Sequence, residues 1–265
     1  MRASVLLLIT LVLLGVTPVA QPVSVLYAGS LVTSMEGPIA AAVLKEDNLQ
    51  FSGEGRGSKA LANFIASGIR HPDVFISADT ALVDGLAKQG LVASSVTFGN
   101  ASMVLGYSPK STHRALFEAV GAGKTSLLDA LRTPGLRIVR TDPQLDPKGA
   151  RTIEAVRILG GDAAVAAILG PGENPTQIVP EENLLVRLET GEADLGFLYS
   201  TESTARKIPA IPLPGKASLS DEITYTLAIM KRAPHPDAAQ RFADFILKGD
   251  GRAILEDAGI HYRPR

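Results

Sequence analysis

The sequence predicts an α/β protein with two lobes, because short β-rich runs alternate with longer amphipathic segments along most of its 265 residues. Such alternation is typical of strands joined by crossover helices that cover both faces of a parallel sheet. Hydrophobic residues make up 46% of the chain, which supports a packed globular core rather than disorder. The 25 glycines and 17 prolines suit the many tight connections of such a fold.

The first unit consists of three successive strand and helix pairs. We expect strands at 24–28, 49–52 and 73–76, and helices at 33–45, 58–67 and 81–89. A further strand at 103–107 precedes a less regular region.

The second unit begins near residue 136. We expect strands at 136–140, 194–199 and 210–213, and helices at 150–159 and 182–189. A strand-like run at 223–230 and helices at 238–247 and 251–258 then indicate a return to the first unit.

These elements predict two lobes that are joined by two crossings of the chain. We expect lobe 1 at residues 21–106 and 216–265, and lobe 2 at residues 107–215. Ligands of such sheets bind beyond the carboxyl ends of the strands. We therefore expect a ligand cleft between the lobes.

Residues 1–20 have the features of a secretory signal peptide. Arg2 supplies a positive charge, residues 5–16 are almost all apolar, and Ala20 is a small residue at a plausible cleavage point. The apolar run is shorter than the roughly 20 residues that span a bilayer, which favours cleavage over a membrane anchor. We therefore expect a periplasmic or otherwise extracytoplasmic protein. It has no cysteine, so disulfides and thiolate metal sites are excluded.

Composition and motifs argue against several function classes. The formal net charge of −1 does not suggest a nucleic acid partner. The four histidines lack metal-ligand spacing, and no Gly-x-Ser-x-Gly motif occurs. The run 121–126 resembles the end of a phosphate-binding P-loop, but the earlier glycine and the preceding strand are missing. We assign no catalytic residue.

Two Gly-Ser turns are candidate anion-binding sites. Gly29 and Ser30 follow the first strand, and Gly57 and Ser58 follow the second, each directly before a helix. Free backbone N–H groups at a helix start, next to a small hydroxyl, suit an anion. For Ser58 the alternative is a capping role at its own helix.

Three later side chains are further candidates. Asp146 lies in a stiff loop with two Asp-Pro steps, Glu181 follows Pro180, and Tyr199 ends a strand. Asp146 and Glu181 each precede or open a helix, where acids commonly offset the helix dipole. The alternative for Tyr199 is an ordinary residue at the rim of the sheet.

Together these stretches resemble the periplasmic molybdate/tungstate-binding proteins of ABC transporters, in particular the archaeal-type branch. One departure is the run Lys148-Gly149-Ala150-Arg151, where the family usually has Cys-Gly-Tyr-Arg. The matching stretches occur in the family's order and cover most of the chain after residue 20: 27–31, 57–58, 73–79, 142–147, 181–185, 189–194 and Tyr199.

The resemblance implies the two-lobed periplasmic-binding-protein fold of type II, which closes over one oxyanion. On the matching positions, Asp146 and Glu181 would approach the metal of the oxyanion and raise its coordination from four towards six. Large Mo(VI) and W(VI) accept such added donors, whereas the sulfur of sulfate does not, so the two acids would disfavour sulfate. Lys148 is placed to form a salt bridge with Asp146 in an open state. The remaining ligand hydrogen bonds would come from Gly29, Ser30, Gly57, Ser58 and Tyr199.

The resemblance thus implies a monomeric receptor that binds molybdate or tungstate, needs no other cofactor and delivers its ligand to a membrane permease. One alternative is a tetrahedral site for sulfate or another oxyanion, with Asp146 and Glu181 acting only as helix-start acids. The other is an enzyme on the same scaffold, with these two residues as an acid/base pair.

Overall fold

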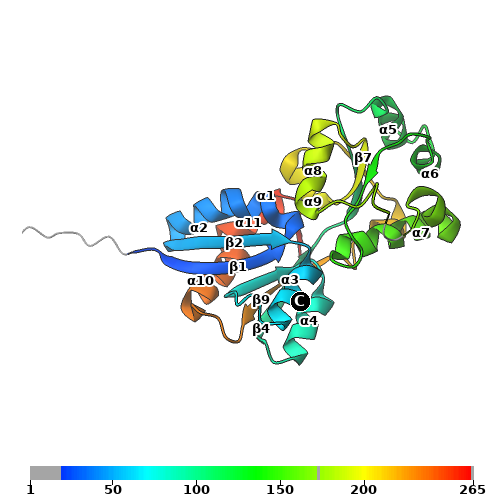
Figure 1. The fold of residues 1–265 in the computed structure, drawn as a ribbon. Coiled ribbons are helices and arrows are strands. Elements are labelled where there is room, and N and C mark those ends of the chain that lie inside the picture. Colours follow the sequence, from blue (N-terminus) through cyan, green and yellow to red (C-terminus); the bar gives the residue numbers. More distant parts are fainter. Residues whose placement is uncertain (1–18, 172–173, 264–265) are drawn as a thin grey trace, which may run out of the picture.

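The computed structural model describes residues 19–171 and 174–263, and nearly all of the expected signal peptide lies outside these ranges. Two groups of strands and helices lie side by side in Figure 1, one containing β1 and β2 and the other containing β7. Within the described ranges, no helix has the length and apolar character needed to cross a bilayer.

The first sheet contains six strands in the order β10-β4-β9-β3-β1-β2. Strand β1 pairs in parallel with β2 and β3, whereas β9 runs antiparallel to both β3 and β4. The bounds are β1 Gln21–Ala28, β2 Leu49–Arg56, β3 Val74–Ser77, β4 Val92–Asn100, β9 Thr224–Met230 and β10 His261–Tyr262.

The expectation of a wholly parallel sheet is therefore wrong. The chain leaves the first sheet after the last residue of β4 and returns at the first residue of β9. Because the exit and the return lie at the same edge, β9 has to run away from that edge, opposite to β1, β2 and β3. The direction of β9 is set by the return of the chain from the second sheet.

The second sheet contains four strands in the order β6-β7-β5-β8. Strand β5 runs antiparallel to β7 and β8, and β6 is parallel to β7. The expected boundary at residue 106 places nearly all of β5 in lobe 1, but β5 pairs within this second sheet. We propose that the crossings lie at 101–102 and 213–223. The bounds are β5 Met103–Tyr107, β6 Ile138–Val139, β7 Leu195–Tyr199 and β8 Ala210–Pro212.

The helices surround both sheets. In the first lobe the structure has η1 Gly29–Leu31, α1 Val32–Ser34, the π-helical turn η2 Met35–Ile39, α2 Ala40–Asp47, α3 Ser58–Ala66, α4 Thr80–Lys88, α10 Pro236–Lys248 and α11 Asp250–Asp257. In the second lobe it has α5 Arg114–Gly121, α6 Leu127–Leu131, α7 Pro147–Ile168, α8 Glu181–Thr190 and α9 Ser200–Arg206. The short turn η3 Gly215–Ser218 lies in the second proposed crossing.

Two of the expected helices differ in form from the expectation. The helix expected at 33–45 is interrupted by η2, which contains Pro38. Proline lacks an N–H donor and disrupts regular helical hydrogen bonding, so the backbone widens at this turn. The helix expected at 150–159 extends over all of α7, and its second part follows a break at Gly160 and Gly161.

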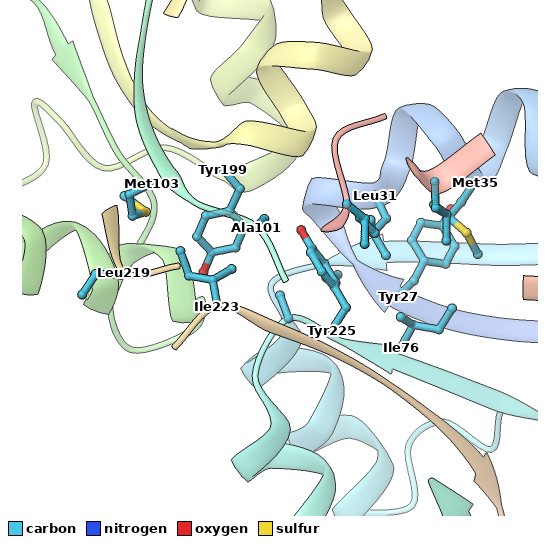
Figure 2. Close-up of a cluster of buried hydrophobic side chains, with 14 of the residues drawn as sticks. Tyr27, Leu31, Met35, Ile76, Ala101, Met103, Tyr199, Leu219, Ile223 and Tyr225 are labelled. Atoms are coloured by element: carbon cyan, nitrogen blue, oxygen red, sulfur yellow. The ribbon is translucent and has the colours of Figure 1, made fainter. Parts of the chain in front are cut away.

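The buried core runs continuously between the two sheets. Figure 2 shows Met103 and Leu219 at one end of a buried cluster and Tyr27 and Ile76 at the other. The crossing segments also bond to each other, because the backbone N–H of Ala101 donates to the carbonyl of Ile223 over 3.1 Å. This shared core holds the two lobes against each other at the crossings.

Candidate functional site

Helix starts from both lobes carry the predicted site residues. Gly29 opens η1, Ser58 opens α3 and Glu181 opens α8. Asp146 and Tyr199 are the residues directly before α7 and α9. Since backbone N–H groups at a helix start lack partners within the helix, this arrangement favours a negatively charged or strongly accepting group.

Close contacts across the cleft bring these helix starts together. A Cβ atom on Gly29 would overlap the carboxylate of Glu181. A Cβ atom on Gly57 would lie 2.6 Å from the carbonyl oxygen of Leu145 and 3.1 Å from Cβ of Asp146. The N–H of Ala60 donates to the same Leu145 carbonyl over 3.1 Å. Only glycine allows the backbone of lobe 1 to approach lobe 2 this closely.

The two predicted serines are buried and already hydrogen-bonded. The hydroxyl of Ser30 lies 2.8 Å from the hydroxyl of Tyr225. The hydroxyl oxygen of Ser58 accepts from the N–H of Ala78 over 3.1 Å, which leaves its O–H free to donate elsewhere. Gly57 occupies the position before α3, and no side chain caps that helix. The capping alternative for Ser58 is therefore wrong.

Three predicted side chains on the lobe 2 side carry buried oxygens without a hydrogen-bond partner. These atoms are Oδ2 of Asp146, Oε2 of Glu181 and the hydroxyl of Tyr199. The three residues are 6%, 9% and 1% exposed. An unsatisfied buried polar atom costs about 1–3 kcal/mol, so the presence of three such atoms makes this place a candidate site for a polar ligand. The rim alternative for Tyr199 is wrong, because its side chain is almost fully buried.

A buried lysine occupies the centre of this acidic group. The Nζ atom of Lys148 lies 3.0 Å from Oε1 of Glu181 and 2.7 Å from Oε1 of Glu202, and the lysine side chain is fully buried. The expected pairing of Lys148 with Asp146 is not the one observed in this arrangement. Instead, Oδ1 of Asp146 accepts the backbone N–H of Lys148 over 2.9 Å and so caps α7. Helix capping turns the aspartate back onto its own helix, while the longer lysine side chain reaches the glutamates.

Sequence reasoning missed Glu202, although a local signal was present. Glu202 is the third residue of α9, and its Oε2 accepts the backbone N–H of Tyr199 over 2.8 Å. An acidic residue at this position after a helix start is half of a capping box. Its second role, as a partner of Lys148, depends on tertiary packing and leaves no sequence signal.

Sequence reasoning also missed Tyr225 and Thr201, which link the lobes. The hydroxyl of Tyr225, on β9 of lobe 1, lies 2.8 Å from Ser30 and 3.1 Å from the hydroxyl of Thr201, on α9 of lobe 2. Both residues are buried. This chain of three hydroxyls connects the first Gly-Ser turn directly to lobe 2.

Burial and neighbouring charges shift the acidity of the site. Burial, aided by the Glu181 carboxylate, raises the pKa of Asp146 to about 8. Burial also raises the pKa of Glu202, despite the nearby Lys148 ammonium. For Lys148, burial acts to lower the pKa, but the Glu181 and Glu202 carboxylates outweigh it and raise the pKa above its usual range. Lys148 is therefore charged at neutral pH.

The hydroxyl of Tyr199 is neutral at physiological pH. Burial raises the pKa of Tyr199 well above its usual value, and the Asp146 carboxylate acts in the same direction. A neutral phenol is a hydrogen-bond donor, so Tyr199 suits an oxyanion oxygen. The site thus combines donors with carboxylates, and a single ammonium partly offsets the carboxylate charge.

A hollow of about 330 Å³ borders the acidic group and is lined by both lobes. Arg56, Gly57 and Ala60 line it from lobe 1, and Leu145, Asp146 and Glu181 are among the residues that line it from lobe 2. In residues 19–171 and 174–263, no group of three His, Cys, Asp or Glu side chains is arranged to hold a metal ion. Two of the carboxylates, those of Glu181 and Glu202, form ion pairs with the ammonium of Lys148 instead.

A two-lobed α/β fold with a polar site between its lobes defines the class of periplasmic binding proteins. Residues 23–261 match the family model for bacterial extracellular solute-binding proteins, so the chain belongs to that family.

Three known proteins illustrate the relationship. A Haloferax volcanii protein, provisionally named an ABC transporter molybdenum-binding protein, is 31% identical over 257 residues, which cover 92% of this chain and 81% of that protein. The molybdate-binding protein ModA of Mycobacterium tuberculosis is 30% identical over 207 residues, which cover 77% of this chain and 70% of that protein. The periplasmic molybdate-binding protein of Azotobacter vinelandii superimposes with a TM-score of 0.72 at 22% identity, covering 90% of this chain and 98% of that one. The last likeness confirms the predicted fold.

Proposed function

We propose that this chain is an extracytoplasmic receptor that captures molybdate or tungstate between its lobes and delivers the anion to the membrane permease of an ABC transporter. The single observation that carries the proposal is the set of buried, unpartnered oxygens on Asp146, Glu181 and Tyr199. Among these atoms, Oε2 of Glu181 lies against Gly29 of lobe 1. The names of the relatives support the same ligand class.

In this proposal lobe 1 supplies general oxyanion contacts. Gly29 and Gly57 let backbone N–H groups approach the anion, and Ser30 and Ser58 contribute hydroxyls. These groups hold any small oxyanion, so they account for binding but not for the choice of ligand.

In this proposal lobe 2 determines which anion binds. Tyr199 donates to an oxyanion oxygen, while the free oxygens of Asp146 and Glu181 approach the central metal. Carboxylates next to a dianion repel it unless the central atom accepts their oxygens. Mo(VI) and W(VI) can expand their coordination in this way, so the carboxylates favour these anions over sulfate.

The binding role needs no catalytic residue, and we propose that the chain is a monomer without enzymatic activity. The contacts between the lobes, such as Ala60 with Leu145, describe a closed arrangement. A ligand that contacts both lobes at once stabilises this arrangement, which a permease can distinguish from an open one.

Calorimetric titration with molybdate and tungstate tests the proposal. The pKa of Asp146 is raised to about 8 in the empty protein, so its carboxyl releases a proton when its oxygen binds the central metal. We expect binding to the native chain and a loss of about 30-fold or more in Asp146→Asn, because an amide cannot supply this carboxylate oxygen. Asp237→Asn is the matched control, because Asp237 is an exposed acid in the first turn of α10. Native protein that binds neither anion would overturn the proposal, as would turnover of a small phosphate or carbonyl substrate.

A further inference from the structure

The ammonium of Lys148 lies within the acidic cluster but is not part of the proposed ligand set. Lys148 lies on α7, Glu181 on α8 and Glu202 on α9. Its fully buried side chain therefore joins the starts of three helices through two ion pairs of 3.0 and 2.7 Å. Such a group is costly to bury without partners, so its position is set by these two carboxylates.

The two oxygens of Glu181 have different surroundings. Oε1 accepts a hydrogen bond from Lys148, whereas Oε2 is buried, has no partner and lies against Gly29. A glutamate side chain has several rotamers, and the bond to Oε1 selects the one that leaves Oε2 facing lobe 1. Lys148 thus determines which oxygen of Glu181 is presented across the cleft.

The charges lead to the same conclusion. Asp146, Glu181 and Glu202 place three acidic side chains around the site, and Lys148 is the only cation within salt-bridge distance of any of them among residues 19–171 and 174–263. An oxyanion that enters next to Glu181 meets a carboxylate whose charge is partly offset on its far side. Without Lys148, the same carboxylate would turn away from Glu202 and repel the ligand.

We infer that Lys148 is a positioning residue for oxyanion binding, which holds Glu181 with Oε2 directed at the central metal and offsets its charge. This inference rests on the proposed function. Lys148 itself makes no contact with the ligand in this scheme. Lys148 affects binding only through the position and charge of Glu181. A residue that merely stabilises the fold would not depend on Glu181 in this way.

A double-mutant cycle on tungstate affinity tests this coupling. Lys148→Met removes the ammonium and keeps the length of the side chain. We expect it to weaken tungstate binding by about 30-fold or more in the native background, yet by less than about 3-fold in a Glu181→Gln background. In a Glu202→Gln background the loss is again about 30-fold, because Glu181 is still present to be misplaced.

The Glu202→Gln background also guards against misfolding. Lys148→Met alone leaves two buried carboxylates without a cation, whereas the double variant leaves one. Thermal melting shows which variants are folded. If Lys148→Met alone is unfolded, the effect of Lys148 on affinity is measured by comparing Glu202→Gln with Lys148→Met/Glu202→Gln.

Tungsten X-ray absorption of the loaded protein gives a second readout that a structural role would not change. We expect the native protein and Glu202→Gln to show carboxylate oxygens beyond the four of tungstate, and Lys148→Met to show fewer. An equal loss of affinity in all three backgrounds, no loss at all, or an unchanged coordination shell would each overturn the inference. If the native chain binds no tungstate, the proposed function itself fails.

Discussion

The two sides of the cleft differ in how their polar groups are satisfied. On lobe 1, the hydroxyls of Ser30 and Ser58 already have protein partners. On lobe 2, Asp146, Glu181 and Tyr199 each keep a buried oxygen without one. The two serines of lobe 1 are thus held by the protein itself, whereas lobe 2 has donor and acceptor atoms that are free to bind a ligand. From this difference we propose that general affinity resides on lobe 1 and ligand choice on lobe 2.

The largest expected loss of affinity comes from adding a side chain at Gly29, where the two sides of the cleft are in contact. Gly29→Ala places a methyl group where the Glu181 carboxylate lies, so the carboxylate has to leave its observed position. We expect a loss of about 100-fold in molybdate affinity by calorimetry. Gly85→Ala is the control, because a Cβ at this position in α4 meets nothing within 4 Å. Native affinity in Gly29→Ala would show that Glu181 does not need its observed position.

A second variant separates the ligand-directed acids of lobe 2 from an acid that serves the fold. Asp194 is buried and accepts hydrogen bonds from Arg137 and Ser111. Asp194→Asn should lower the free energy of unfolding by about 1–3 kcal/mol at pH 7 and leave molybdate affinity within about 3-fold of native. Urea denaturation and calorimetry measure the two quantities, and a large loss of affinity would contradict the separation.

The lowered pKa of Asp194 predicts that the stability of the folded protein depends on pH. Burial acts to raise the pKa of Asp194, but the Arg137 and Ser111 hydrogen bonds outweigh it and lower the pKa to about 2. A carboxyl with a lowered pKa stabilises the folded state above its unfolded value of about 4, and this stabilisation is lost as pH falls towards 2. Denaturation of native protein should therefore become easier between pH 4 and 2, and Asp194→Asn should lack this component. A parallel decline in both proteins would show that other groups cause it.

Tyr199→Phe should have opposite effects on the empty and the loaded protein. The hydroxyl of Tyr199 is buried without a partner, so its removal should raise the melting temperature of the empty protein or leave it unchanged. Affinity for molybdate should fall by about 10-fold, because one donor to the anion is lost. Melting curves without molybdate test the expected stability of the empty variant, and curves with molybdate test its weaker binding. A lower melting temperature of the empty variant would argue against an unpartnered hydroxyl.

The smallest effect on molybdate binding among the site residues is expected at Ser30. Ser30→Ala removes a hydroxyl that bonds Tyr225, so it should cost about 1 kcal/mol of stability. Molybdate affinity should fall by less than about 5-fold, equally for sulfate if sulfate binds at all. Competition titrations measure this, and a selective loss of molybdate over sulfate would place ligand choice on lobe 1 as well.

Local signals in the sequence predicted much of the fold. The strands β1, β3, β5 and β7 begin or end within a few residues of their expected bounds, because apolar runs between turns identify buried strands. The elements β4, α5, α6, α9 and β10 were not predicted. Their sequences are short or mixed, and packing against the rest of the chain determines their structure.

The order and direction of the strands were not predictable in the same way. They depend on where the chain re-enters the first sheet, which involves residues more than 100 positions apart, such as Ala101 and Ile223. Local patterns carry no information on such pairing.

At the site, the sequence predicted which residues stand at helix starts but not which of them interact. Glycines before helices and acids at helix starts have local signatures, so the positions of Gly29 and Glu181 at helix starts were predicted. Tyr225 lies within an ordinary apolar strand, and the preference of Lys148 for Glu181 and Glu202 depends on three separate helices. Those features follow from tertiary packing alone.

The ratio of tungstate to sulfate affinity tests most directly the claim that lobe 2 chooses the ligand. We predict that the native chain binds tungstate at least about 1,000-fold more tightly than sulfate, and that Asp146→Asn/Glu181→Gln reduces this ratio to about 10-fold or less. A ratio that stays the same in the double variant, or native protein that binds the two anions equally, would contradict the account.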